Sequence, residues 1–239
     1  MTSPIRAMLL AAGLGTRLRP ITLRTPKCLV QVAGEALLGR WLQQLESAGC
    51  ESVLINTHYL AQQVVDFLEN WHSQQMQIVT TYEPELLGTA GTLLENHSFF
   101  EGSTGLLIHA DNAMEGDLRE LLFAHKNRSD QCLLTMLTFQ TDHPKSCGIV
   151  ATDSDGIITE FHEKVDNPPG NCANGALYVF DSSFIDHILS MSPPPSDFST
   201  EVIPSLLGKI QSWRTYKPYL DIGTPASLAQ AQTLLSPIS

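Results

Sequence analysis

Residues 5–20 read IRAMLLAAGLGTRLRP, and this stretch does most to predict the fold of the chain. Residues 5–12 are almost continuously apolar, which is typical of a central strand buried on both faces. Gly13-Leu14-Gly15 follows directly, so backbone N–H groups of this turn are expected to approach a phosphate chain. Arg17 and Arg19 would add positive charge beside it. The stretch therefore predicts an α/β protein with a candidate nucleotide site at the end of its first strand.

This glycine turn does not match two other phosphate-binding motifs. Leu18 stands where a dinucleotide fingerprint has its third glycine, and a convincing ribose-binding acid about 20 residues further on is missing. The chain also lacks the GxxxxGK[ST] run of a P-loop. Because glycine turns after strands are common in α/β proteins, other segments must support the nucleotide site. An oxidoreductase that uses a dinucleotide is disfavoured.

Elsewhere, short apolar runs alternate with segments of helical period, which predicts a central mixed, mostly parallel sheet flanked by helices. Asp155-Gly156 indicates a hairpin turn, and no internal repeat or linker divides the chain. A single domain over residues 1–239 is therefore expected. Strands are expected at 52–56, 76–82, 105–109, 132–139, 148–153, 157–161, 174–180 and 213–219, and helices at 36–48, 60–71, 117–126, 182–191, 200–207 and 225–235.

The composition is that of a globular protein and excludes several classes of function. Of the 239 residues, 43% are hydrophobic and 16% charged, and a chain of this length buries about 70% of its unfolded surface. The 14 Lys and Arg against 25 Asp and Glu give a net charge of −11, so nucleic acid is not an expected partner. Five scattered cysteines without a CxxC pair indicate free thiols and no zinc site.

The hydropathy pattern indicates no membrane segment. No stretch approaches about 18 consecutive apolar residues. The run at residues 7–12 is too short for a spanning helix or the centre of a signal peptide. We therefore expect a cytoplasmic protein with no membrane partner.

Six segments, in order along the chain, together resemble the signature of the sugar-1-phosphate nucleotidyltransferases. The matches run from residue 10 to residue 224, nearly the whole chain, and six would not arise in this order by chance. The resemblance implies a Rossmann-like nucleotidyltransferase fold that joins a nucleoside triphosphate to a sugar 1-phosphate and releases pyrophosphate with Mg²⁺ present. The segments are residues 10–20 with Thr25-Pro26-Lys27, Leu87-Gly88-Thr89-Ala90-Gly91, Asp111, Phe161-His162-Glu163-Lys164, Asn174-Gly175-Ala176-Leu177-Tyr178 and Leu220-Asp221-Ile222-Gly223-Thr224.

The resemblance also implies roles for individual residues. A nucleotide-binding half would cover about 1–143 and a sugar-phosphate-binding half about 144–239. An in-line attack by a phosphate oxygen needs neutralisation of negative charge more than a base, and Mg²⁺ is usually held by one or two carboxylates plus phosphates. The implied residues are Arg17, Lys27 and Lys164 as catalytic cations, Asp111 and Asp221 as metal ligands, Glu163 and Asn174 as sugar ligands, and Leu10, Ala12, Gly13, Gly15, Thr16, Gly88, Thr89 and Gly91 as nucleotide ligands.

Taken alone, each of these residues has a simpler interpretation. Arg17 and Lys27 would be solvated loop cations, and Asp111 or Asp221 would be a turn or helix-cap residue. Asn174 would satisfy a local backbone group. The ordered set of matches favours the functional interpretation over these.

Among subfamilies, the short bacterial mannose-1-phosphate guanylyltransferases are the most similar, through residues 25–27, 146–150 and 171–175. GTP and mannose 1-phosphate are therefore the expected substrates, and a homo-oligomer is left open. One alternative is a uridylyl- or thymidylyltransferase that uses UTP or dTTP with another sugar 1-phosphate. Another is a sensor that binds a nucleotide sugar without making it. Because all five implied cations and metal ligands are present, an active enzyme is favoured over the sensor.

Overall fold

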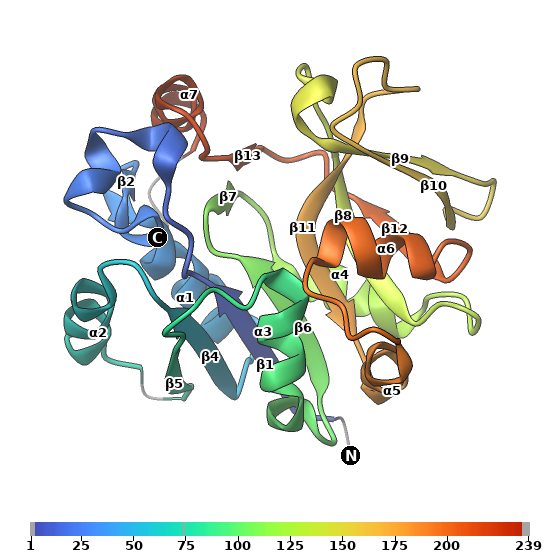
Figure 1. The fold of residues 1–239 in the computed structure, drawn as a ribbon, viewed down its shortest axis with the longest axis horizontal. Helices are drawn as coiled ribbons and strands as arrows, with labels where there is room; N and C mark the ends of the chain where they lie inside the picture. Colours follow the sequence, from blue (N-terminus) through green and yellow to red (C-terminus); the bar gives the residue numbers. More distant parts are fainter. Residues whose placement is uncertain (1–2, 74, 236–239) are drawn as a thin grey trace. The chain divides into compact units, whose positions relative to one another are not determined.

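The structure is a computed structural model that describes residues 3–73 and 75–235. It divides into two compact units that interleave along the sequence (Figure 1). We call one the turn unit, because it contains the glycine turn, and it covers residues 4–86, 107–118 and 217–235. We call the other the hairpin unit, and it covers residues 3, 87–106 and 119–216.

The turn unit is built on parallel strands, with β1 (Ile5–Leu10) paired to β4 (Ser52–Thr57) and β4 to β5 (Gln77–Tyr82). These three strands lie side by side in Figure 1. The end of β6 (Thr104–His109) lies beside β1. The turn unit also contains the helices α1 (Leu37–Ser47), α2 (Ala61–Glu69) and α7 (Pro225–Leu234). It contains two antiparallel strand pairs, β2 (Gln31–Val32) with β3 (Glu35–Ala36) and β7 (Asn112–Met114) with β13 (Tyr219–Asp221).

The sequence pattern of the turn unit explains its elements. In β1 the side chains of Ala7, Met8 and Leu9 are fully buried, as a strand covered on both faces requires. Helix α1 buries one face that includes Trp41 and Leu42, which matches its apolar period of three and four residues. The helix ends because the chain takes a left-handed conformation just after it, at Gly49 (φ 78°), which glycine adopts without strain.

The hairpin unit has a mostly antiparallel sheet. Strand β11 (Cys172–Phe180) pairs antiparallel with β8 (Leu134–Gln140) and β9 (Gly148–Thr152), and β9 pairs antiparallel with β10 (Ile158–Glu163). Strand β12 (Ile210–Arg214) is parallel to β8. The helices of this unit are α3 (Thr89–Glu95), α4 (Leu118–Lys126, apart from its first residue), α5 (Ser182–Ser190) and the short α6 (Ile203–Ser205).

Aromatic side chains form the core of the hairpin unit. Tyr178 and Phe180 of β11, Phe184 of α5 and Phe198 are all fully buried. Their rings lie 4.4 Å apart for Tyr178 and Phe198 and 4.9 Å apart for Phe180 and Phe184. At these separations aromatic pairs contribute about 0.5–1.5 kcal/mol beyond their buried area. The hydrophobic residues of β11 and α5 are therefore packed as one cluster.

The predicted fold class is confirmed: a mixed sheet with helices around it. Most elements also lie within about two residues of their predicted bounds, including the hairpin that turns at Gly156 (φ 77°). The parallel pairs belong mainly to the turn unit and the antiparallel pairs to the hairpin unit. The prediction of a single domain over the whole chain stays a prediction. Across residues 3–73 and 75–235, no helix is long and apolar enough to cross a membrane.

Several local predictions were wrong. The strand expected at 213–219 is two strands, because β12 ends at Arg214 and β13 begins only at Tyr219, after Pro218, which has no N–H to donate to a ladder. Residues 89–91, for which no helix was predicted, form the first turn of α3. The helix expected at 200–207 is a π-helical turn over Phe198–Val202 followed by α6.

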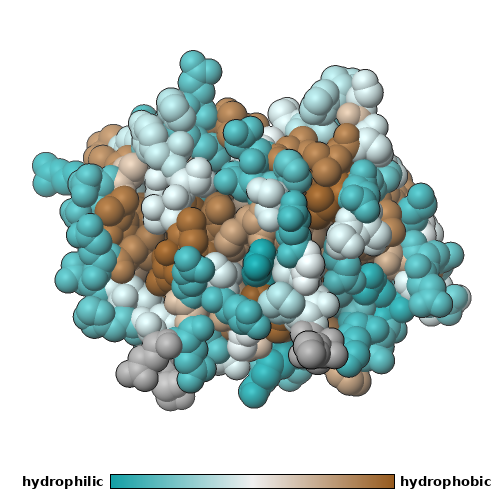
Figure 2. All heavy atoms as spheres, turned by 90° about the horizontal axis from the view of Figure 1, so that it is seen from below, coloured by the Kyte–Doolittle hydropathy of each residue, from teal (hydrophilic) through white to brown (hydrophobic). Residues whose placement is uncertain are grey.

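Part of the surface is apolar. The face seen in Figure 2 carries hydrophobic side chains between hydrophilic ones. In the turn unit, Leu23, Tyr82 and Leu86 are exposed. Exposed apolar residues scattered in this way are common on globular proteins and do not by themselves indicate a partner.

Candidate active site

The glycine turn leaves β1 through one tightly held peptide group. The Leu10 carbonyl accepts a hydrogen bond from the Ala110 N–H (3.1 Å), and the Ala11 N–H donates to the Asn56 side-chain oxygen (2.7 Å). Ala12 is buried beyond it, whereas Gly13 is exposed and a Cβ atom placed there would meet nothing within 4 Å. The turn therefore has a fixed base and an open tip at Gly13, where a ligand can approach the backbone.

Gly15 is required by the shape of the turn. Its φ of 61° is left-handed, and a Cβ atom there would lie 2.8 Å from the Thr22 methyl group. The Thr22 hydroxyl donates to the Gly15 carbonyl at 2.7 Å, which closes the loop. Thr16 begins the short 3₁₀ turn that follows, and Arg17, also in that turn, is 61% exposed at its side chain. The turn thus presents the Arg17 guanidinium to solvent.

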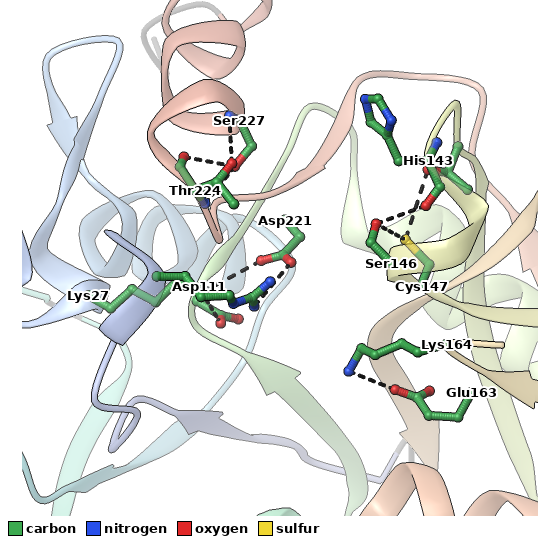
Figure 3. Close-up of polar contacts among 12 residues, drawn as sticks. Lys27, Asp111, His143, Ser146, Cys147, Glu163, Lys164, Asp221, Thr224 and Ser227 are labelled. Atoms are coloured by element: carbon green, nitrogen blue, oxygen red, sulfur yellow. Dashed lines mark hydrogen bonds and ion pairs between the residues drawn. The ribbon is translucent and has the colours of Figure 1, made fainter. Parts of the chain in front are cut away.

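The two predicted metal ligands come together in the turn unit. Strand β13 pairs with β7, so that Asp221 lies opposite Asn112, and the Ile222 N–H donates to the Asp111 carbonyl at 3.0 Å. Figure 3 shows the side chains of Lys27, Asp111 and Asp221 pointing toward one another. Two aspartates far apart in sequence are therefore neighbours, and their role as metal ligands stays a prediction.

Lys27 is buried between these carboxylates. Its ammonium contacts Asp111 Oδ2 directly and lies 3.6 Å from Asp221 Oδ1, while Arg17 Nη2 lies 3.8 Å from Asp221 Oδ2. The Lys27 side chain is only 9% exposed. The solvated loop cation considered from the sequence is therefore wrong for Lys27, because the fold places it against Asp111.

Electrostatics keep Asp111 ionised. Burial by itself raises the pKa of this carboxyl group, but the opposing charge and hydrogen bond of Lys27, with a contribution from His109, outweigh burial. The net result is a pKa below the ordinary value for aspartate. Asp111 is therefore available as an anionic ligand at neutral pH.

The arrangement of the two aspartates fits a magnesium ion. One cationic atom, Lys27 Nζ, already lies within 4 Å of oxygens from both Asp111 and Asp221, so a single cation can interact with both. Over the described parts of the chain, no group of three or more His, Cys, Asp or Glu side chains could hold a metal. A magnesium ion here would therefore need water or phosphate oxygens as further ligands, as is usual for Mg²⁺.

The segment after Asp221 is shaped by a residue that sequence reasoning did not single out. A Cβ atom at Gly223 would lie 2.9 Å from Asp221 Oδ2 and 3.0 Å from Arg17 Nη2. Next to it, Thr224 caps α7, accepting from the Ser227 N–H (3.1 Å) while Ser227 Oγ accepts from the Thr224 N–H (3.0 Å) (Figure 3). Gly223 thus leaves room for two site residues, and its place in the Asp-Ile-Gly-Thr motif was the available signal.

In the hairpin unit, Glu163 and Lys164 lie at the end of β10. Lys164 has a left-handed φ of 50°, its N–H donates to the Cys147 carbonyl (3.2 Å), and its ammonium lies 2.8 Å from Glu163 Oε1 (Figure 3). A Cβ atom at Gly148 would lie 2.6 Å from both Glu163 Oε2 and the Phe161 ring. The strained backbone and the missing side chain at Gly148 together determine where this pair lies.

Asn174 is engaged within its own strand. Its Oδ1 accepts from the Ala176 N–H and its Nδ2 donates to the Tyr178 hydroxyl, both at 2.8 Å. Ala176 has a left-handed φ of 51°, and β11 changes register between Asn174 and Tyr178. The local role considered from the sequence is therefore present, and sugar binding by Asn174 stays a prediction.

The segment 87–91, which contains three of the implied nucleotide ligands, is hydrogen-bonded to another loop of the hairpin unit. The Ala90 and Gly91 N–H groups both donate to the Ser196 carbonyl, at 2.9 and 3.3 Å, and a Cβ atom at Gly88 would lie 2.3 Å from that oxygen. The Thr89 hydroxyl accepts from the Phe198 N–H at 2.8 Å. Gly88 is therefore needed for close packing, and the Gly91 N–H already has an acceptor within the protein.

Glu201 fixes the loop that receives this segment. Its Oε2 accepts from the Asp197 and Ser196 N–H groups, at 2.7 and 2.6 Å, and these hydrogen bonds lower the pKa of the Glu201 carboxyl. Sequence reasoning did not single out Glu201. An acidic side chain just after a proline-rich turn was the only signal.

A family comparison assigns this chain to a class. Residues 6–236 match the model of the family described as nucleotidyl transferase, so the chain belongs to that family. This agrees with the resemblance found in the sequence and with the fold.

Individual relatives carry names that are more specific than the family description. The chain is 31% identical over 231 residues to a mannose-1-phosphate guanylyltransferase of Mycobacterium tuberculosis, covering 94% of this chain and 62% of that protein. It is 30% identical to the mannose-1-phosphate guanylyltransferase catalytic subunit beta of Drosophila pseudoobscura pseudoobscura, covering 92% and 59%. The chain thus spans about three fifths of the length of these relatives.

Solved structures share the fold at lower identity. A candidate glucose-1-phosphate thymidylyltransferase from Bacillus anthracis, in complex with sucrose, has a TM-score of 0.88 at 22% identity, covering 98% of this chain and 96% of that one. HddC from Yersinia pseudotuberculosis complexed with GMP-PN has a TM-score of 0.76 at 22% identity, covering 95% and 97%. These likenesses support the nucleotidyltransferase fold.

Proposed function

We propose that this chain transfers a nucleotidyl group from a nucleoside triphosphate to a sugar 1-phosphate, giving a nucleotide sugar and pyrophosphate. The observation that carries the proposal is the cluster of Arg17, Lys27, Asp111 and Asp221 at the end of the first strand, beside a glycine turn with an open tip at Gly13. Such a cluster can neutralise a triphosphate and hold the metal ion that accompanies it.

In the proposed reaction a phosphate oxygen of the sugar attacks the α-phosphorus in line with the leaving pyrophosphate. The protein then has to position two anions and stabilise their charge, and no general base is needed. Arg17, which is largely exposed, would bind the triphosphate, and the backbone at Gly13 would approach it. Asp111 and Asp221 would hold Mg²⁺, which supplies positive charge to the phosphate oxygens when bound.

Lys27 would bind the triphosphate by exchanging one anionic partner for another. Its ammonium now pairs with the Asp111 carboxylate, and phosphate oxygens would replace Asp111 as the anionic partner of Lys27. In the hairpin unit, Lys164 is 61% exposed and would hold the attacking phosphate, with Glu163 accepting hydrogen bonds from sugar hydroxyls. These assignments follow the charges of the residues and the family resemblance.

GTP and mannose 1-phosphate are the substrates we propose, because relatives at 30–31% identity carry the name mannose-1-phosphate guanylyltransferase. The test is pyrophosphate release from GTP, ATP, UTP, CTP and dTTP with mannose, glucose and N-acetylated amino-sugar 1-phosphates. We expect GTP with mannose 1-phosphate to give the highest kcat/KM. If UTP or dTTP exceeds GTP about tenfold, equivalent to roughly 1.4 kcal/mol, the guanylyl assignment is wrong and the reaction class stands.

The same assay tests the alternative of a sensor. A sensor would bind a nucleotide sugar but release no pyrophosphate with any pair of substrates. We expect an enzyme, since two cations, Arg17 and Lys27, lie close to the carboxylates of Asp111 and Asp221 in the turn unit. A cytoplasmic location is also proposed, supported by five cysteines that are all free.

A further inference from the structure

One buried side chain connects the ends of three strands in the turn unit. Asn56, the partner of Leu10 in the pairing of β4 with β1, accepts from the Ala11 N–H through Oδ1 at 2.7 Å. Its Nδ2 donates to Glu83 Oε1, just beyond the end of β5, at 2.9 Å. Asn56 and Glu83 are 3% and 4% exposed. The amide therefore bridges the ends of β1 and β5 from its own position near the end of β4.

Asn56 explains how the chain leaves the sheet at the glycine turn. Residues of β1 pair with β4 by backbone hydrogen bonds up to Leu10. A further backbone pair would keep Ala11 in the strand, whereas the Asn56 side chain satisfies the Ala11 N–H and lets the backbone turn away. An apolar side chain at this position would leave a buried N–H without its acceptor.

The same peptide group is held on its other side by the segment that carries a proposed metal ligand. The Leu10 carbonyl accepts from the Ala110 N–H, and Asp111 is the next residue. The Leu10–Ala11 peptide is thus held between Ala110 and Asn56, and its position determines where the turn begins relative to Asp111. A small displacement of this peptide would move Gly13 and Asp111 relative to each other.

Glu83 determines which way the Asn56 amide faces. The Ala11 N–H donates to the amide and the Glu83 carboxylate accepts from it, so only one orientation of the amide makes both hydrogen bonds. Glu83 is itself held, because its N–H donates to the Thr57 carbonyl at 2.9 Å and its carbonyl lies 2.8 Å from His58 Nδ1. The backbone of Glu83 is therefore held in place, and its carboxylate extends from there to the Asn56 amide.

We propose that Asn56, oriented by Glu83, is a positioning residue for triphosphate binding. It acts through the Leu10–Ala11 peptide on the tip of the turn at Gly13 and on Asp111, without touching the substrate. The inference rests on the proposed function of this site, and goes beyond it by assigning work to a buried pair outside the charged cluster. Effects of this kind are large because a displacement of about 1 Å can cost a hundredfold in rate.

The first test compares the Asn56→Leu variant with the Thr57→Val variant. Thr57 is the next residue of β4, is also 3% exposed, and its hydroxyl donates to the Thr81 carbonyl, away from the turn. The measurements are the Kd of GTP with Mg²⁺ by calorimetry, steady-state pyrophosphate release, and the midpoint of urea unfolding. We expect Asn56→Leu to raise the Kd of GTP at least tenfold, and Thr57→Val to change it less than twofold at a similar loss of stability.

The second test exchanges the donor and the acceptor. Asn56→Asp keeps an acceptor for the Ala11 N–H but turns a carboxylate toward Glu83, so GTP binding should weaken at least tenfold at neutral pH. Adding Glu83→Gln supplies the missing donor, and the double variant should return to within threefold of the wild type. A merely structural role would give no such recovery in GTP affinity. This series remains informative if Asn56→Leu does not fold.

The results separate the positioning role from the proposed function. If the wild type is active and the Asn56 variants bind GTP no worse than Thr57→Val, Asn56 is only structural. If Glu83→Gln does not improve Asn56→Asp, the orienting role of Glu83 is wrong. If the wild type releases no pyrophosphate with any substrate pair, the proposed function itself is wrong, and the positioning role is abandoned with it.

Discussion

Lys27 and Arg17 are both cations of the candidate site, but the structure gives them different surroundings. Lys27 is 9% exposed and contacts Asp111, whereas Arg17 is 61% exposed and lies 3.8 Å from Asp221. An exposed ion pair at that distance contributes little to stability, while removing one partner of a buried pair leaves a charge without compensation. The two cations should therefore respond differently to substitution.

We expect Arg17→Ala to lower kcat/KM about a hundredfold to a thousandfold and to leave the free energy of unfolding nearly unchanged. Lys27→Ala should lower activity as strongly and also destabilise the fold by about 1–3 kcal/mol, because Asp111 loses its partner. Pyrophosphate release and urea unfolding of the two variants check this. Near-normal rates in both would remove them from the catalytic machinery, and equal stabilities would contradict the buried ion pair.

The aspartates make a separate prediction about the metal. Asp111→Asn and Asp221→Asn each replace an anionic ligand with a neutral one of similar shape, so each should raise the Mg²⁺ concentration needed for half-maximal activity. Both variants should remain folded, which circular dichroism would show. If a Mg²⁺ titration of pyrophosphate release is the same in both variants as in the wild type, the aspartates are structural and the metal assignment is wrong.

Among the elements, β11 and α5 of the hairpin unit depend on a glycine in a neighbouring strand. A Cβ atom at Gly105 would lie 2.3 Å from the Phe180 ring and 2.8 Å from the Phe100 ring. Both rings are buried and lie 5.0 Å apart, so neither can move without disturbing the aromatic core. The missing side chain at Gly105 thus leaves room for these two rings, and glycine is not needed there for a left-handed φ.

Gly105→Ala should therefore lower the free energy of unfolding by about 1–3 kcal/mol through overpacking. Gly170→Ala is the matched control, since a Cβ atom there would meet nothing within 4 Å and the residue has no left-handed φ. Denaturant unfolding of both variants gives the comparison. A Gly105→Ala variant as stable as Gly170→Ala would show that the core around Phe180 is less tightly packed than described.

Helix α4 is joined to the residue before α5 by charged groups. Asp181 Oδ2 lies 2.9 Å from Arg128 Nη2 and 3.3 Å from His125 Nε2, and His125 Nδ1 lies 2.8 Å from Thr135 Oγ1. The hydrogen bond from His125, together with the nearby charges, lowers the pKa of Asp181 to about 2. Burial lowers the pKa of His125 below its ordinary value, although Asp181 opposes this. These groups couple stability to pH.

The direction of the pH dependence follows from the two shifts. The folded state holds Asp181 ionised. Its contribution to the free energy of unfolding is therefore fully present above the ordinary aspartate pKa near 4 and is lost as the pH falls toward about 2. Because the folded state keeps His125 neutral, stability also falls as pH drops below about 6.5, where the unfolded histidine takes up a proton. Asp181→Asn should flatten the acid part of a curve of unfolding free energy against pH between pH 4 and 2, and an unchanged curve would contradict this account.

At the scale of the whole molecule, the implied site residues are divided between two units that interleave along the sequence. The turn unit holds the glycine turn, Arg17, Lys27 and both aspartates, whereas the hairpin unit holds Glu163, Lys164, Asn174 and the segment 87–91. The predicted halves, divided near residue 144, do not coincide with this grouping. Residues 217–235 belong with the amino-terminal strands because β13 pairs with β7, a contact between segments far apart in the chain.

Local sequence was sufficient to predict most of the secondary-structure elements. The apolar period of α1, the buried run of β1 and the Asp-Gly turn between β9 and β10 act within a few residues, so their signals survive in the sequence alone. The order of the six motif segments supplied the family, and the family comparison agrees over residues 6–236. These features do not depend on knowing which segments meet.

The tertiary structure decided which partner each site residue has. Lys27 pairs with Asp111, 84 residues away, and Asn56 bridges Ala11 to Glu83, none of which periodicity can indicate. Ser196 accepts from the first turn of α3 for the same reason. Sequence determines the propensity and the chemical type of each residue, but contacts between distant segments depend on packing of the entire chain, where burial and hydrogen-bond satisfaction select one set of partners.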